Sequence, residues 1–80
     1  MYYAYIITSI ANKNQRYIGF TEDLRHRLKY HNSGKCPHTA KYKPWNLKFY
    51  AAFDSKEAAM NFEKYLKSGS GHLFAKKHNF

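Results

Sequence analysis

The sequence predicts a small α+β fold in which a three-stranded antiparallel sheet is flanked by helices, in the order β-β-α-β-α. Three observations support it. Two strand-like stretches near the N-terminus are joined by a polar turn, two later stretches repeat apolar residues with helical spacing, and an alternating stretch separates these two. The 80 residues suffice for one hydrophobic core, so we expect a single domain over residues 1–80.

A β-hairpin is expected first. Residues 2–8 and 16–20 are rich in β-branched and aromatic side chains, and the residues between them are polar and include two asparagines. Alternate residues of a strand share a face, so Tyr5 lies on the same face as Tyr3 and Ile7, and Tyr17 lies on the same face as Gly19. If Tyr5 pairs near Tyr17, the two hydroxyl groups converge.

Two helices follow in the prediction. The first covers residues 22–31 with Thr21 as its N-cap, and an Asn-Ser-Gly sequence ends it. The second is capped by Asp54, which has the spacing of a capping box with Glu57. It continues until the Ser-Gly-Ser-Gly sequence at 68–71, where glycine favours an end.

The remaining segments are assigned by composition and period. Residues 47–53 alternate, which predicts a third strand with one face on the core. Residues 32–46 hold two prolines and a glycine without a clear period, so we expect a loop containing a helical turn. Its basic residues Lys35, Lys41 and Lys43 are candidates for contacting phosphate. The last nine residues are basic, and we expect a short helical turn there.

The charge of the chain indicates a polyanionic partner. Its formal net charge is +9, from 14 Lys and Arg against 5 Asp and Glu. Basic side chains gain affinity for nucleic acid by releasing its condensed counterions. A basic ribosomal or chromatin protein would have a similar composition, so charge alone leaves a non-catalytic binding protein open.

Neither a membrane span nor a secretory signal is expected. The longest apolar run, at the N-terminus, is much shorter than the roughly 18 residues that a membrane helix needs, and no basic region precedes it. The single cysteine, Cys36, cannot form an internal disulfide, which fits a reducing cytoplasm and is compatible with association with the nucleoid.

Three polar residues occupy positions in the apolar stripes of the two predicted helices. Leu24 and Leu28 begin the first stripe, and Arg27 and His31 complete it; Glu63 completes the second. A buried charge is costly unless it is paired or coordinated, so such positions indicate a functional site. A structural ion pair between Arg27 and Glu63 is the alternative.

Together these groups suit the hydrolysis of a phosphate ester. A carboxylate such as Glu63 can hold a hard divalent cation, and the guanidinium of Arg27 can grip phosphate bidentately. Tyr5 and Tyr17 add proton-transfer groups, and His31 lies one helical turn after Arg27. Taken singly, each tyrosine is an ordinary packed aromatic, and His31 is an ordinary residue at a helix C-terminus.

Two triplets, Tyr3-Ala4-Tyr5 and Tyr17-Ile18-Gly19, resemble the paired motif that names the GIY-YIG nucleases. Arg27 and His31 on the following helix and the later Glu63 resemble this family as well, and the resemblance covers essentially the whole chain. The chain is similar in length to small stand-alone members, and it resembles the N-terminal nuclease domain of the nucleotide-excision-repair endonuclease, the excinuclease.

The resemblance implies an endonuclease that hydrolyses DNA phosphodiester bonds with one divalent metal ion. It implies that Glu63 binds this Mg²⁺ or Mn²⁺, that Arg27 stabilises charge on the attacked phosphate, and that Tyr5 and Tyr17 flank the attacking water. Whether a tyrosine or His31 is the general base stays open, since an unperturbed phenol is a poor base at neutral pH. No small-molecule cofactor is expected.

The chain also departs from the family pattern. Tyr3 and Ala4 replace the glycine and isoleucine of the first triplet. Phe20 occupies a place where relatives often have a basic residue, so Arg25 or Lys29 would supply that phosphate contact. The stretch from Gly69 to Lys76, which follows the second helix, lacks an asparagine that assists the site in several relatives.

Eighty residues leave no room for a separate recognition domain, so we expect structure-selective or weakly sequence-specific cutting, in DNA repair or recombination. RNA stays open as a substrate, as does a targeting protein partner. The main alternative is a non-catalytic nucleic-acid-binding protein that retains the nuclease fold, and a ribosome-associated protein is the third. An inward Glu63 favours the enzyme, because a binding module needs only surface Lys and Arg.

Overall fold

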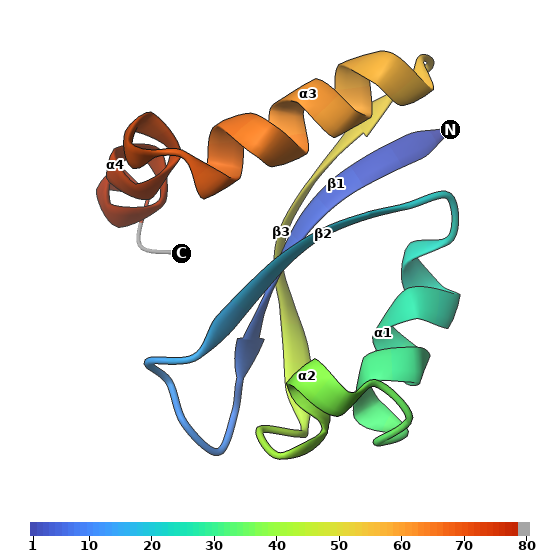
Figure 1. Ribbon diagram of the computed structural model, residues 1–80, viewed down its shortest axis with the longest axis vertical. Coiled ribbons are helices and arrows are strands. Elements are labelled where there is room, and N and C mark those ends of the chain that lie inside the picture. The colour runs from blue at the N-terminus through green and yellow to red at the C-terminus, as the bar shows by residue number, and fades with distance from the viewer. Residues whose placement is uncertain (79–80) are drawn as a thin grey trace.

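A sheet of three antiparallel strands separates two layers of helices in the computed structural model, which describes residues 1–78 (Figure 1). In chain order the elements are β1 (Tyr2–Ser9), β2 (Arg16–Thr21), α1 (Leu24–Asn32), α2 (Pro37–Ala40), β3 (Trp45–Phe53), α3 (Lys56–Lys67) and α4 (Gly69–Lys77). The strand order is β2-β1-β3, so β1 is central and β2 is an edge strand. The predicted α+β fold is confirmed, and none of the described helices is long and apolar enough to cross a membrane.

The hairpin register aligns the two tyrosines of the motif on one face. Tyr5 lies opposite Gly19, and Tyr17 lies opposite Ile7 two positions along the sheet. Residues two apart in a strand share a face, so Tyr5 and Tyr17 are diagonal neighbours. Their ring centroids are 6.5 Å apart, which fulfils the expectation that they converge.

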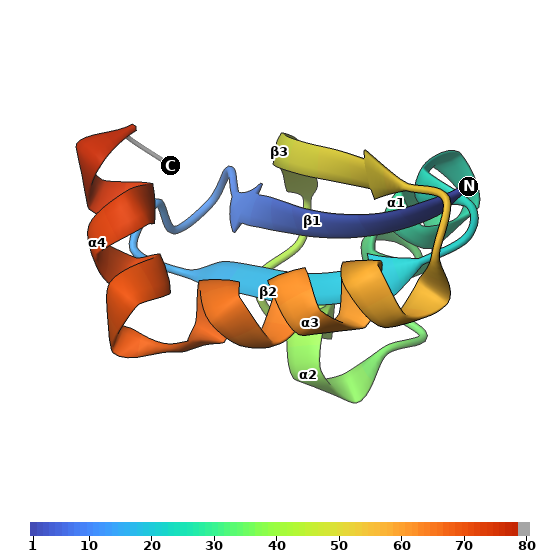
Figure 2. The ribbon, with the colours of Figure 1, turned by 90° about the horizontal axis from the view of Figure 1, so that it is seen from above.

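Each face of the sheet carries its own hydrophobic cluster. The phenylalanine cluster lies under α3 and α4 and consists of Ala4, Ile6 and Leu66 with Ile18, Phe49, Phe53, Phe62 and Phe74. The tyrosine cluster lies under α1 and consists of Tyr5, Ile7 and Trp45 with Tyr17, Leu24, Leu28, Tyr42 and Leu47. Figure 2 shows α3 running alongside β2 on one side of the sheet, with α4 beyond the C-terminal end of α3. Each fully buried large apolar side chain contributes about 1.5–3 kcal/mol to the stability of the fold.

Strand β3 serves both clusters because it contains a bulge. Ile6 pairs with Phe49 but the next residue, Ile7, pairs with Leu47, which leaves Lys48 as the extra residue. Leu47 therefore packs in the tyrosine cluster and Phe49 in the phenylalanine cluster. The predicted alternation is confirmed, the expectation of a single core face is wrong, and the strand begins two residues earlier than predicted.

The first helix begins later than the sequence suggested. Thr21 is still paired in β2 with Tyr3, so the chain has not yet left the sheet at the predicted N-cap. Asp23 is the N-cap instead, and its carboxylate accepts a hydrogen bond from the His26 N–H at 3.0 Å. The Thr21 hydroxyl accepts from the Asp23 N–H at 3.1 Å and so closes the turn that leads into α1.

The second predicted cap is also displaced. Ser55, whose backbone is extended, caps α3 by accepting from the Ala58 N–H at 3.3 Å. The predicted capping box between Asp54 and Glu57 is therefore wrong, because the chain needs one further extended residue to turn from β3 into the helix. Glu57 remains in the first turn of α3, where a carboxylate suits the positive end of the helix.

The Ser-Gly-Ser-Gly sequence ends one helix and starts another. Ser68 ends α3, and its hydroxyl accepts from the Gly71 N–H at 3.2 Å as the N-cap of α4. A side chain at position 71 would collide with the Tyr65 carbonyl oxygen. The short C-terminal turn that was expected is the nine-residue helix α4, and residues 79–80 lie outside the described residues.

The predicted basic loop contains the expected helical turn, α2. The side chain of Asn32 holds the far end of this loop, because its Nδ2 donates to the Trp45 carbonyl at 3.1 Å. The indole N–H of Trp45 donates to the Thr39 carbonyl at 2.8 Å. The loop is therefore tied to the sheet by hydrogen bonds as well as by packing.

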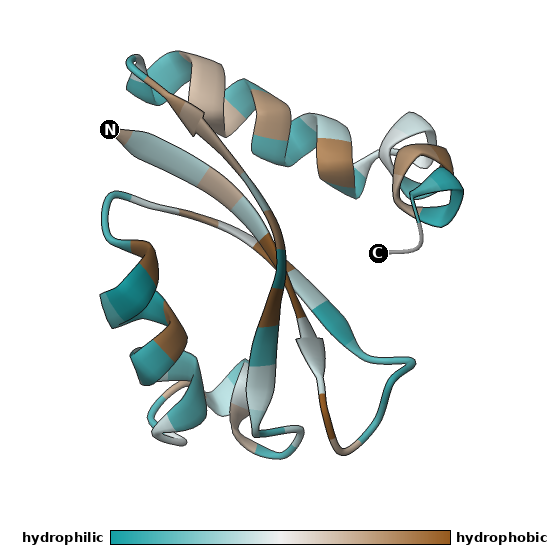
Figure 3. Ribbon diagram, turned by 180° about the vertical axis from the view of Figure 1, so that it is seen from behind, coloured by the Kyte–Doolittle hydropathy of each residue, from teal (hydrophilic) through white to brown (hydrophobic). Residues whose placement is uncertain are grey.

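In the hydropathy view of Figure 3, α1 is largely hydrophilic, whereas apolar segments gather along the central parts of the strands.

Candidate active site

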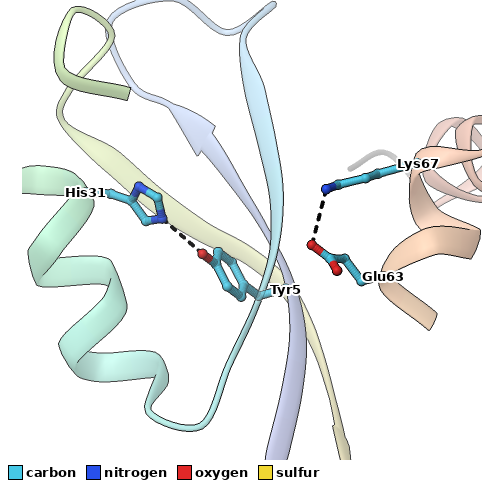
Figure 4. Close-up of polar contacts among 4 residues, drawn as sticks. All are labelled: Tyr5, His31, Glu63 and Lys67. Carbon is cyan, nitrogen blue, oxygen red and sulfur yellow. Dashed lines mark hydrogen bonds and ion pairs between the residues drawn. The ribbon is translucent and has the colours of Figure 1, made fainter. Parts of the chain in front are cut away.

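His31 is the centre of a buried chain of hydrogen bonds in the tyrosine cluster. Its Nε2 lies 2.9 Å from the Tyr5 hydroxyl (Figure 4), and its Nδ1 lies 3.0 Å from the Thr39 hydroxyl. His31 and Thr39 are each 1% exposed and Tyr5 is 3% exposed. A neutral imidazole has one donor and one acceptor nitrogen, so each hydroxyl can satisfy one of them. In the described residues, no buried side-chain nitrogen or oxygen lacks a partner.

The three residues of this chain come from three different elements. The last turn of α1 positions His31, β1 supplies Tyr5 and α2 supplies Thr39. Pro37 is at the first position of α2, where its fixed φ favours the start of a helical turn. The fold therefore fixes the imidazole from both sides.

Gly19 is required at its position by sterics. It lies directly across from Tyr5, whose ring and hydroxyl fill the space that a side chain would occupy. A Cβ at position 19 would collide with the hydroxyl oxygen and come within 2.9 Å of Cε1. The glycine of the second triplet thus lets the Tyr5 ring cross β2 toward His31.

Tyr17 and Arg27 border the same chain of hydrogen bonds. The Tyr17 ring centroid is 4.9 Å from that of His31, and Tyr17 is half-buried. Arg27 lies one turn before His31 on α1 and is also half-buried, with its guanidinium 5.4 Å from the centre of the Tyr30 ring. This cation–π contact holds the guanidinium beside the cluster.

Burial controls the ionisation of the two central groups. It raises the pKa of Tyr5 above its ordinary value, the neighbouring Tyr17 and Glu63 act in the same direction, and Arg27 opposes them. Burial also lowers the pKa of His31, and the positive charge of Arg27 lowers it further. Near neutral pH, Tyr5 is therefore a neutral phenol and His31 a neutral imidazole.

Glu63 approaches the cluster from the other side of β2. Figure 4 shows the β2 ribbon running between Tyr5 and His31 on one side and Glu63 with Lys67 on the other. The Glu63 side chain is 21% exposed, and its carboxylate pairs with Lys67 Nζ at 3.2 Å. Among the described residues, no salt bridge joins Glu63 to Arg27, so the predicted alternative of a structural pair between them is not formed. The polar residues inferred to face inward thus belong to two opposite faces of the sheet.

The donor set fits a hydrated hard cation. No group of three or more His, Cys, Asp or Glu side chains able to hold a metal occurs in the part of the chain that the structure describes. Mg²⁺ ordinarily keeps several waters and takes one or two carboxylates together with substrate phosphates. A single half-buried carboxylate at Glu63 meets that requirement, whereas a closed four-ligand zinc site would not be satisfied.

The basic residues predicted to contact nucleic acid are all exposed, and they are Arg25, Lys29, Lys35, Lys41 and Lys43. Two of them lie on α1 and line a shallow depression of about 330 Å³, and three lie in the segment around α2. Because α1 carries part of the tyrosine cluster, these cations lie on the Tyr5 side of the sheet.

Sequence reasoning missed Thr39. Its side chain is a partner of His31 across the loop that follows α1, and no periodic pattern in residues 32–46 marks it. The one available signal was Pro37, which indicates that a helical turn begins there and would place the hydroxyl two residues later on the turn.

Comparison with known proteins identifies the family of the chain. Two UPF0213 proteins of Streptococcus pyogenes, from serotype M5 (strain Manfredo) and serotype M3 (strain SSI-1), are each 48% identical over 52 residues, which cover 64% of this chain and 56% of the relative. The chain thus matches little more than half the length of these relatives, whose names give no substrate. The family model described as the GIY-YIG catalytic domain matches residues 1–79. This nuclease-type match spans the motif tyrosines, Arg27 and Glu63, and the chain therefore belongs to the GIY-YIG catalytic domain family.

Proposed function

We propose that this chain is a metal-dependent endonuclease that hydrolyses phosphodiester bonds in DNA. One observation carries the proposal: Arg27 on α1 and Glu63 on α3 lie on helices that cover opposite faces of the sheet, and their opposite charges both act on the pKa of the buried Tyr5 hydroxyl. A cation and a carboxylate placed around one edge strand suit a phosphate held between a guanidinium and a metal ion.

The tyrosines take different roles in this proposal. Tyr5 keeps its proton, because its pKa is raised and its hydroxyl is buried against His31. His31 is buried, so it does not contact water directly. Its role is to hold Tyr5 and Tyr17 in position. Tyr17 is half-buried and borders His31, so it is the group of these three that contacts the attacking water.

The charged residues complete the proposed mechanism. Arg27 stabilises the negative charge that develops on the attacked phosphate, and such preorganised donors typically contribute about 10²–10³-fold in rate. Glu63 holds the divalent cation, Mg²⁺ or Mn²⁺, which when bound supplies Lewis-acid stabilisation to the phosphate and the leaving oxygen. The products would be a 5′-phosphate and a 3′-hydroxyl.

The proposed substrate is DNA of irregular structure, such as nicks, flaps or mismatches met in repair or recombination. The net charge of +9 supports binding to the phosphate backbone, which carries no sequence information. A reducing cytoplasm that contains the nucleoid is the compartment we propose, consistent with the free thiol of Cys36.

The test is cleavage of labelled duplex, nicked, flapped and single-stranded DNA in Mg²⁺, Mn²⁺ or EDTA, with wild-type protein and Arg27→Gln. We expect cutting that requires the metal and falls at least about 10²-fold in the variant. Lys64→Gln, at an exposed position of α3 with no assigned role, likewise removes one cation and is the matched control, which should keep most of the activity. Cutting that survives EDTA, or that Arg27→Gln leaves unchanged, would refute the proposal.

A non-catalytic nucleic-acid-binding protein is the second candidate, and the Glu63–Lys67 pair favours it. This ion pair occupies the carboxylate that a metal would need. The same assay separates the two functions: salt-sensitive binding of every DNA with no product in any metal would support the binding protein.

A further inference from the structure

A basic pocket lies at the hairpin end of the sheet. Its cavity of about 370 Å³, here called the hairpin pocket, is lined by Thr8, Ser9, Ile10, Lys13, Arg16, Asn46 and Lys48. None of the residues assigned to the candidate active site lines it. The pocket therefore needs an explanation of its own.

The floor of the hairpin pocket is a row of polar residues across all three strands. Thr8 pairs with Arg16 on β2 and with Asn46 on β3. Directly paired residues share a face, and Thr8 continues the face of Ile6, which packs in the phenylalanine cluster. The floor thus lies on the face opposite to Tyr5, where the apolar residues of that cluster give way to polar ones.

Three cations surround this floor, and the described lining contains no Asp or Glu. Lys13 and Lys48 are exposed, and Lys48 is the extra residue of the β3 bulge. Arg16 is half-buried, and its Nη2 donates to His72 Nδ1 on α4 at 3.0 Å. An arginine held in this way loses less side-chain entropy when it binds an anion.

We propose that the hairpin pocket binds a backbone phosphate of nucleic acid, away from the phosphate that is cut. Lysine, arginine, hydroxyl and amide groups are those that contact phosphate oxygens. Among the described residues, the pocket lining has no aromatic side chain on which a base could stack, which favours backbone over base recognition. This inference deepens the proposed function and rests on it for the identity of the ligand.

The two sites are linked through the edge strand. Arg16 and Tyr17 are neighbours in β2, and successive strand residues point to opposite faces. One lies in the hairpin pocket and the other beside His31. A nucleic-acid strand that crosses the β2 edge would therefore meet the hairpin pocket on one face and Tyr17 beside His31 on the other.

The first test is equilibrium binding of a fluorescent DNA duplex in EDTA over a series of salt concentrations, for wild-type protein, Lys13→Ala and Lys48→Ala. Each substitution should lower the slope of log K against log salt by about 0.9, the value for one phosphate contact on B-DNA. Lys64→Ala, at an exposed position of α3, is the matched control and should keep the wild-type slope. Unchanged slopes for both pocket variants, or an equal decrease for Lys64→Ala, would overturn the proposal.

A second arm separates a backbone contact from a site for a free anion. In the wild-type protein, inorganic phosphate or the DNA duplex is titrated while the amide resonances of the pocket residues are followed by NMR. We expect DNA to shift these resonances at concentrations at which inorganic phosphate does not. Saturable shifts with phosphate and none with DNA would overturn the proposal in favour of a free-anion site.

The binding test does not depend on catalysis. If the protein fails to cut any DNA while both pocket variants show the lowered salt slope, the proposed function fails and the hairpin pocket stands. If the protein cuts DNA and the pocket variants bind and cut as wild type does, the proposed function stands and the hairpin pocket fails.

Discussion

The two faces of the sheet carry cores of different chemistry. The buried members of the phenylalanine cluster are wholly apolar. The tyrosine cluster encloses a histidine and two hydroxyl groups in a chain of hydrogen bonds. Burying polar groups costs free energy that hydrogen bonding only partly returns, so the second arrangement is not the most stable one available. Its place at the family motif indicates that the tyrosine cluster serves chemistry and the phenylalanine cluster serves stability, while Glu63 on α3 lies outside both clusters.

The largest effect on stability is expected on the phenylalanine face. Leu66 is fully buried there, and Leu66→Ala should destabilise the fold by about 2–5 kcal/mol, because it removes apolar contacts and leaves a cavity. Leu73→Ala, at a residue that is 70% exposed on α4, should change stability by less than about 0.5 kcal/mol. Urea denaturation measures both. Equal stability of the two variants would contradict the assignment of this face to stability.

A smaller loss of stability and a loss of activity should coincide on the tyrosine face. Tyr5→Phe keeps the ring but leaves a buried nitrogen of His31 without its partner, which costs about 1–3 kcal/mol. Since Tyr5 positions His31, cleavage should slow as well. Tyr50→Phe is the control, because Tyr50 pairs with Tyr5 across β1 and β3 but is exposed. If the two variants unfold at the same urea concentration, the buried chain of hydrogen bonds through His31 contributes no net stability.

The pH dependence of the free energy of unfolding should also distinguish the tyrosine cluster from the phenylalanine cluster. Burial and Arg27 lower the pKa of His31, so around pH 6 the unfolded chain binds more protons at this group than the folded chain does. Its stabilising contribution is complete above about pH 6.5 and is lost as the pH falls toward the lowered value. His31→Gln should therefore unfold with a weaker pH dependence between about pH 7.5 and 5.5, limits that bracket the ordinary value. The exposed His38→Gln should retain the wild-type dependence, and the reverse pattern would contradict a buried neutral His31.

The smallest effect concerns the cap of α3. Ser55→Ala should lower the free energy of unfolding by about 0.5–2 kcal/mol, because the Ala58 N–H loses its acceptor. Asp54→Ala should be nearly neutral, since the structure assigns it no cap. Thermal unfolding of the two variants side by side decides between the observed cap and the one that the sequence suggested.

The elements and the inward position of His31 were predictable because strand and helix periods are local properties. A helical period tells which side of a helix faces the core, but it does not tell which face of the sheet the helix covers. For that reason Arg27 and Glu63 seemed to share one interior, whereas their helices, α1 and α3, cover opposite faces of the sheet. Thr39 meets His31 across an irregular loop, and the bulge at Lys48 depends on pairing with the distant strand β1, so no periodic pattern encodes either feature.

The helix caps were misplaced for a related reason. Thr21 and Asp54 are good N-cap residues, and so are their neighbours Asp23 and Ser55. The choice depends on where the chain leaves the sheet, which is set by the pairing of β1 with β2 and β3. Residue preference therefore locates a helix start only to within a few positions.

The central claim is that Glu63 serves the chemistry of the site. It is tested most directly by the cleavage rate at saturating DNA, over a Mg²⁺ titration, for Glu63→Gln against Glu57→Gln. Both residues lie on α3 and both changes remove one carboxylate, but Glu57 is in the exposed first turn. We predict a loss of at least about 10²-fold for Glu63→Gln and near wild-type cutting for Glu57→Gln. Equal rates for the two variants, with equal dependence on Mg²⁺, would contradict the account.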